Sequence, residues 1–143
     1  ETGCRQLHIV NRTAERAHQL IAEWKASNSS NTPHQILTSG GLNDAASPAG
    51  WDVVINATSA SLSGDAIQLP ADAISADGFA YDMMYGKALT PFLETQKATG
   101  IQHLADGLGM LVEQAAVAFA LWRGVTPQTE PVYQTLRERL ARH

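Results

Sequence analysis

The sequence predicts an α/β fold, with a mainly parallel sheet flanked by helices. Two observations support this prediction. Short apolar segments typical of buried strands alternate along the chain with longer segments of helical periodicity. The length of 143 residues and a hydrophobic content of 44% suit a single globular domain. Strands joined through helices pair in parallel, because a parallel pair needs a long crossover connection.

Five segments are predicted to be strands because they are short, apolar and bounded by turn-forming residues. They are residues 7–10, 34–37, 51–57, 78–84 and 101–104. The strongest candidate is 51–57, because its Val-Val-Ile run suits a strand that is buried on both faces. A polar loop over residues 27–33 precedes the second strand.

Four segments are predicted to be helices from their apolar spacing and their terminal residues. They are residues 14–27, 91–99, 109–123 and 131–141. Thr13 can cap the first helix, and Pro91 occupies the first position of the second, where proline is tolerated. Gly100 and Gly124 end the second and third helices. The first helix has one apolar face, made of Ala17, Leu20, Ile21 and Trp24.

Composition excludes several classes of function. The net charge of −4 and the absence of a basic stripe argue against nucleic acid as the main partner. The apolar run over residues 115–122 is too short to span a bilayer, so no membrane partner is expected. A single cysteine fits a reducing cytoplasm. The five histidines lack the spacing of metal ligands, so no metal site is expected.

The first strand is followed by Asn11-Arg12-Thr13, with Arg16 one turn later. The first strand of this chain would correspond to the second strand of a Rossmann fold, the end of which faces the adenosine ribose. At that position an acid binds a free 2′-hydroxyl, whereas an arginine pairs with a 2′-phosphate. This segment therefore predicts NADP rather than NAD. The strand and Gly-x-Gly-x-x-Gly turn that should precede it are not found in the few residues upstream, so we expect a Rossmann-like domain truncated at its N-terminus.

Five motifs occur in the order seen in shikimate dehydrogenases, and the chain resembles that family along nearly its whole length. They are Asn11-Arg12-Thr13 with Arg16, residues 55–59 (INATS), 81–85 (YDMMY), 90–93 (TPFL) and 106–116 (DGLGMLVEQAA). The resemblance implies reduction of 3-dehydroshikimate to shikimate with NADPH, in the chorismate pathway of aromatic amino acid biosynthesis. It also implies a separate N-terminal substrate domain. Residues 1–143 would then be a partial NADP-binding domain that includes the helices at 109–123 and 131–141.

The resemblance also implies roles for individual residues. Those expected to bind the cofactor are Asn11, Arg12, Thr13, Arg16, Thr58, Met83 and Gly107. Tyr85 and Gln114 would contact shikimate. The family's catalytic lysine and aspartate lie in the substrate domain, so no catalytic residue is expected in this chain, and we assign Lys87 to solvent.

Other interpretations remain open at this stage. Each of these side chains, taken alone, is also typical of a solvated surface or a core position. The chain could come from a quinate/shikimate dehydrogenase with mixed cofactor use, or act as a catalytically inactive nucleotide-binding or assembly fragment. Without a strand between them, residues 7–10 and 51–57 would carry unpaired edges. We expect these strands to pair with each other directly, or to be closed by self-association with a second copy.

Overall fold

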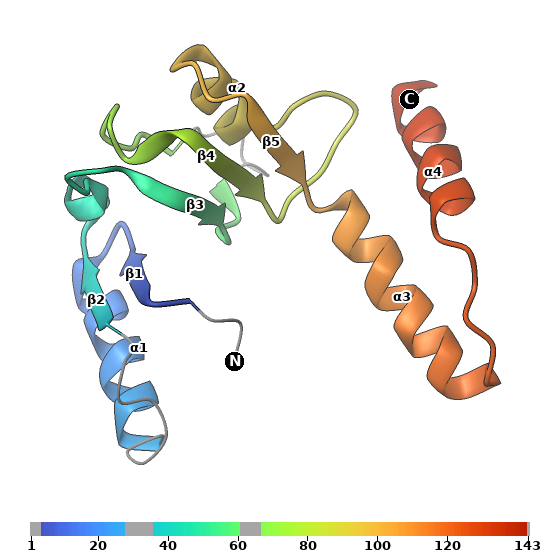
Figure 1. Cartoon of the computed structure of the whole chain (residues 1–143), viewed down its shortest axis with the longest axis horizontal. Coiled ribbons are helices and arrows are strands. Elements are labelled where there is room, and N and C mark those ends of the chain that lie inside the picture. The colour runs from blue at the N-terminus through green and yellow to red at the C-terminus, as the bar shows by residue number, and fades with distance from the viewer. Residues whose placement is uncertain (1–3, 28–35, 61–66, 143) are drawn as a thin grey trace. The chain divides into compact units, whose positions relative to one another are not determined.

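The computed structural model describes residues 4–27, 36–60 and 67–142, which form two compact units (Figure 1). The first unit contains β1 (Gln6–Val10), α1 (Ala14–Ser27), β2 (Ile36–Gly40) and the short 3-10 helix η1 (Leu42–Ala45). The second contains β3 (Trp51–Asn56), β4 (Ile74–Asp82), α2 (Pro91–Ala98), β5 (His103–Asp106), α3 (Leu108–Arg123) and α4 (Glu130–Arg142). Both units combine parallel strands with helices, as the sequence predicts.

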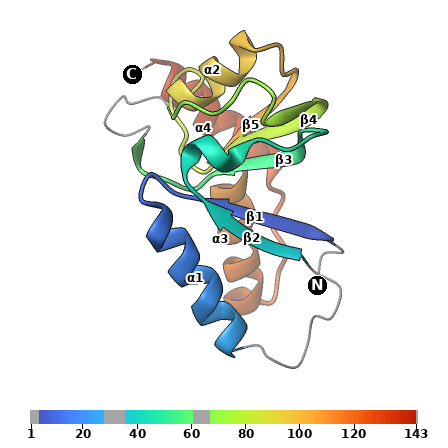
Figure 2. The same ribbon diagram turned by 90° about the vertical axis from the view of Figure 1, so that its left-hand side faces the viewer.

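In the first unit, β1 and β2 pair in parallel and α1 packs against them (Figures 1 and 2). The ladder continues one step beyond β1, because the backbone N–H of Asn11 donates to the carbonyl oxygen of Gly40 at 3.1 Å. Ala17 and Ile21 of α1 are buried against the strands, whereas Leu20 and Trp24 stay partly exposed. The apolar face expected on this helix is therefore only half covered.

In the second unit, the strand order is β3-β4-β5 and all pairs are parallel. Helix α2 packs on one face of this sheet and buries Phe92 and Leu93. On the other face, Val53 and Ile55 are 54% and 59% exposed. Parallel sheets are normally covered on both faces, so this face is an uncovered part of a Rossmann-like sheet.

The strand register places three polar residues in one row at the carboxyl edge of this sheet. Asn56 pairs with Asp82, and Asp82 pairs with Asp106. Each of the three is the last residue of its strand. Open α/β sheets bind ligands at this edge, so the row marks where a site should be sought.

Three strands differ from their expected ranges by two residues or more at both ends, whereas β1 and β3 differ by one residue at one end. β4 begins at Ile74 rather than at residue 78, and it ends at Asp82. β5 begins at His103 rather than residue 101, because the backbone N–H of Ile101 still closes the end of α2 by donating to Gln96. β2 covers residues 36–40 rather than 34–37; residues 34 and 35, and most of the expected loop at 27–33, lie outside the described residues.

The prediction that the strands at residues 7–10 and 51–57 pair directly is wrong. Among the described residues, β1 pairs with β2, β3 pairs with β4, and the two ladders are separate sheets. Direct pairing fails because the neighbours of each strand come from its own unit. Closure of these edges by a second copy stays a prediction.

Within the described ranges, none of the helices has the length and apolarity needed to cross a membrane. The same ranges contain no group of three or more histidine, cysteine, aspartate or glutamate side chains arranged to hold a metal ion.

Candidate functional site

Three of the expected cofactor-binding residues, Thr58, Met83 and Gly107, follow β3, β4 and β5 at the carboxyl edge of the second unit. Backbone hydrogen bonds join their loops. The N–H of Met83 donates to the carbonyl oxygen of Asn56 at 3.0 Å, and the N–H of Gly107 donates to that of Met84 at 3.1 Å. Thr58 and Met83 keep exposed side chains. The structure thus brings these three residues to one edge and leaves two of their side chains open to a ligand.

Gly107 is needed there for space. Its φ of −71° is one that any residue adopts, so backbone conformation does not explain the glycine. A Cβ atom at this position would lie 2.0 Å from the carbonyl oxygen of Met83. The close approach that this glycine permits is therefore to the backbone at the end of β4, whereas the family resemblance implied an approach to the nicotinamide.

The two residues expected to contact substrate are both accessible. Tyr85 is 40% exposed in the loop after β4, and Gln114 is exposed on α3. Neither side chain has a hydrogen-bond partner in residues 4–27, 36–60 or 67–142. Their polar groups are available to an external ligand such as a polyol.

The arginine segment belongs to the first unit, whereas the residues above belong to the second. The side-chain oxygen of Asn11 accepts a hydrogen bond from the backbone N–H of Thr13 at 2.9 Å, which fixes the turn between β1 and α1. Arg12, Thr13 and Arg16 are exposed. Neither arginine has an ion-pair partner within the described part of the chain. Because a helix N-terminus disfavours cations, a bound anion would offset the unfavourable placement of these two arginines.

An ion pair that the sequence analysis did not anticipate joins α4 to the end of β5. The guanidinium of Arg137 donates to both carboxylate oxygens of Asp106, at 2.8 and 2.6 Å. It also donates to the Tyr133 hydroxyl at 3.1 Å, and it lies 5.3 Å from the centre of that ring. Hydrogen bonding to Asp106 raises the pKa of Arg137 above its usual value, although partial burial opposes the rise. This bidentate contact anchors the C-terminal helix to the sheet.

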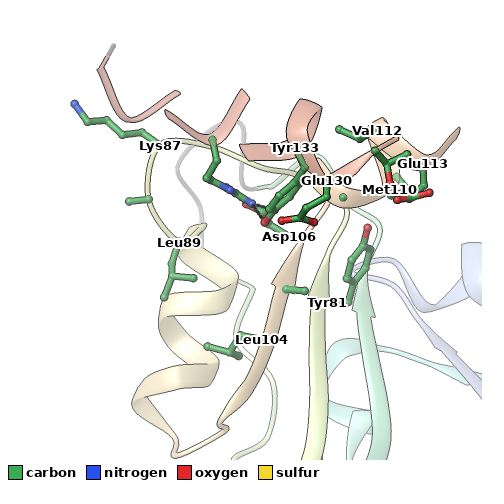
Figure 3. Close-up of a pocket in the computed structure, with 15 residues that line it drawn as sticks. Tyr81, Lys87, Leu89, Leu104, Asp106, Met110, Val112, Glu113, Glu130 and Tyr133 are labelled. Carbon is green, nitrogen blue, oxygen red and sulfur yellow. Dashed lines mark hydrogen bonds and ion pairs between the residues drawn. The ribbon is translucent and has the colours of Figure 1, made fainter. Parts of the chain in front are cut away.

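A cavity of about 580 Å³ lies beside this ion pair (Figure 3). Tyr81, Asp106 and Tyr133 line it, and Lys87 stands at its border with its amine pointing away from the ion pair (Figure 3). Burial, and then the charges of Asp106 and Asp82, raise the pKa of Tyr81. Its hydroxyl therefore stays protonated at neutral pH. None of the residues expected to bind cofactor or substrate lines this cavity, so it is distinct from the edge that carries Thr58 and Met83.

We expect Arg137→Ala to lower the free energy of unfolding by about 2 kcal/mol, because it leaves a carboxylate that is only 9% exposed without its charged partner. Denaturant unfolding measures the loss. Arg142→Ala is the matched control: its pair with Glu138 is 3.6 Å long and largely exposed, so its removal should cost less than about 0.5 kcal/mol. Equal effects of the two substitutions would contradict the anchoring role of Arg137.

Comparison with known proteins matches this chain to one family. Residues 107–137 match the family model described as the Shikimate 5'-dehydrogenase C-terminal domain. A shikimate dehydrogenase (NADP(+)) of Bordetella petrii is 46% identical over 138 residues, covering 96% of this chain and 47% of that protein. A relative with the same name from Thioalkalivibrio sulfidiphilus is 49% identical over 135 residues, covering 94% and 46%. The chain therefore spans about half the length of the curated relatives it matches.

The solved structures that are similar in fold include members of the same family. The crystal structure of shikimate 5-dehydrogenase from Thermus thermophilus in complex with NADP(H) and shikimate has a TM-score of 0.68 and 30% identity, covering 92% of this chain and 45% of that chain. In sequence and in fold, the chain is similar to about half the length of the shikimate dehydrogenases, and the similar part includes residues that match their C-terminal domain.

Proposed function

We propose that this chain is the NADP-binding part of a shikimate dehydrogenase, which reduces 3-dehydroshikimate reversibly to shikimate with NADPH. The names of its relatives and the complex of one structural neighbour with NADP(H) and shikimate support this function. The observation that supports NADP as the cofactor is a pair of exposed arginines, Arg12 just after β1 and Arg16 in the first turn of α1. No acid stands at residues 11–13 to bind a free ribose hydroxyl.

The chemistry of this segment fits a 2′-phosphate. The Arg12 guanidinium carries a fixed charge and a planar fork of donors, which matches phosphate oxygens. Arg16 adds a second charge in the first turn of α1, and a bound dianion would offset the unfavourable interaction of both cations with the helix dipole. Asn11 and Thr13 complete the turn, with Asn11 bonded to the Thr13 backbone as described above.

The residues at the second unit's sheet edge would bind the other end of the cofactor. The Met83 thioether offers a soft apolar wall for the nicotinamide ring, beside Thr58 and Gly107. The bound cofactor would supply the hydride. Tyr85 and Gln114 would hold shikimate through a hydroxyl and an amide, which can both donate and accept hydrogen bonds. The remaining substrate contacts would come from an N-terminal substrate domain, the main protein partner of this chain.

The test is the cofactor preference of the full-length protein. We expect Arg12→Ala to weaken NADPH binding by about 1.5–3 kcal/mol, the value of a charge-assisted hydrogen bond, and to leave NADH binding nearly unchanged. Fluorescence titration with each cofactor measures both affinities. Arg139→Ala, which removes an exposed charge from α4, is the control and should change neither.

The outcomes separate the proposed function from its rivals. Equal losses for NADPH and NADH would refute the 2′-phosphate contact. A wild-type protein that uses NADH as well as NADPH, with quinate as an additional substrate, would instead indicate a quinate/shikimate dehydrogenase with mixed cofactor use.

A further inference from the structure

The carboxyl group of Asp82 is completely buried at the end of β4. Oδ1 accepts hydrogen bonds from the side-chain amide of Asn56 at 3.1 Å and from the backbone N–H of Met84 at 3.0 Å. Oδ2 accepts one from the hydroxyl of Thr90 at 2.5 Å. Asn56 and Thr90 are themselves 4% and 6% exposed. Three buried polar side chains, from β3, β4 and the N-cap of α2, thus form one network.

This network extends to the exposed edge of the sheet. The side-chain oxygen of Asn56 accepts from both the backbone N–H and the hydroxyl of Thr58, at 3.0 and 2.9 Å. The backbone oxygen of Asn56 accepts from the N–H of Met83. Asn56 therefore holds the two residues that would face the cofactor, and Asp82 holds Asn56. Neither Asn56 nor Asp82 is exposed enough to touch a ligand itself.

Stability alone is a poor explanation for such a network. Burying polar groups has a desolvation cost, and well-packed apolar side chains of similar volume are often at least as stabilising. What apolar side chains cannot provide is a directional contact that fixes one loop conformation. A binding site needs such support, because its contacting residues must be held in place before the ligand arrives.

We propose that Asp82 is a positioning residue for the cofactor: through Asn56 and the Met84 backbone it fixes Thr58 and Met83 where they receive the nicotinamide end of NADP(H). This inference rests on the proposed function. It assigns no contact between Asp82 and the cofactor. Thr90 belongs to the same network, because its hydroxyl donates to Asp82 and accepts from the Leu93 backbone N–H at the start of α2.

The test uses Asn56→Leu in the full-length protein, because leucine keeps the side-chain volume and removes both hydrogen bonds to Thr58 and the bond to Asp82. We expect its affinity for NADPH to fall about tenfold. Its affinity for adenosine 2′,5′-bisphosphate, which lacks the nicotinamide end, should not change. Fluorescence titration and calorimetry measure the two affinities. Asp82→Asn keeps the shape of the side chain and should also weaken NADPH binding, by a smaller factor, without changing the affinity for the bisphosphate. This variant replaces Asn56→Leu if Asn56→Leu does not fold.

Phe92→Leu is the control for a general loss of stability. Phe92 is buried in α2 outside the network, so this variant should lower the melting temperature without changing NADPH affinity. Equal losses for NADPH and the bisphosphate, or unchanged NADPH affinity in a folded Asn56→Leu protein, would overturn the positioning role. Failure of the wild-type protein to bind either compound would instead overturn the proposed function.

Discussion

Gly107→Ala is expected to destabilise the protein by about 3 kcal/mol, the upper range for overpacking a tightly packed site. The new methyl group would lie 2.0 Å from the carbonyl oxygen of Met83 and 2.7 Å from its carbonyl carbon. Both are backbone atoms, so no side-chain rotation can relieve the overlap. Either β5 and α3 must move away from the end of β4, or Met83 must move. Chemical denaturation measures the loss of stability.

Gly109→Ala provides the matched control, two residues further along. Nothing lies within 4 Å of a Cβ atom at Gly109, which is inside α3. Because alanine is the better helix former, we expect this variant to be as stable as the wild type or up to about 1 kcal/mol more stable. If both alanine variants unfold at the same denaturant concentration, the steric account of Gly107 is wrong. If the steric account is right, Gly107→Ala should also weaken NADPH binding, because the new methyl group displaces Met83.

Helix positions could be predicted from the sequence more closely than strand positions. α1 covers residues 14–27 as expected, because the periodic spacing of its apolar residues is a local signal. β4 was expected to begin at Gly78, so residues 74–77 were not assigned to a strand. These residues nevertheless continue the strand, and a register shift between Trp51 and Val53 accommodates them. Such an irregularity depends on the partner strand and has no local signature.

The candidate site was predictable only in part. The motifs around Thr58, Met83 and Gly107 place these residues at strand ends, and parallel topology then brings them to one edge. Asp82 and Arg137 were missed, because their partners are distant in sequence: Asn56 lies 26 residues before Asp82, and Asp106 lies 31 before Arg137. One signal was available. Each strand of the second unit ends in a carboxylate or an amide side chain, and in a parallel sheet such residues meet.

The division into two units limits what any sequence pattern could predict about the cofactor site. Arg12 and Arg16 belong to the first unit, and Thr58, Met83 and Gly107 belong to the second. Local motifs predict each group, whereas the distance between the groups depends on contacts that no single motif contains.

The 143-residue chain by itself is expected to show no measurable reduction of 3-dehydroshikimate by NADPH. The resemblance places the proton-transferring lysine and aspartate in a substrate domain, and this chain matches only about half the length of its relatives. Each missing proton-transfer group typically costs about 10²–10⁴-fold in rate. Lys87 does not replace them, because it is exposed and its amine points away from the ion pair (Figure 3).

A spectrophotometric assay of NADPH oxidation checks whether the 143-residue chain is inactive, with the full-length protein as the positive control. Binding of adenosine 2′,5′-bisphosphate by the short chain is the accompanying measurement, because Arg12 and Arg16 are present in it. Binding without turnover is the expected result, because the resemblance implies that the groups for proton transfer lie in the substrate domain, whereas Arg12 and Arg16 lie in this chain. Turnover by the short chain at the rate of the full-length protein would show that a group within residues 1–143 transfers the proton. Tyr85 would then be the first residue to test, because its hydroxyl is exposed near the proposed nicotinamide position.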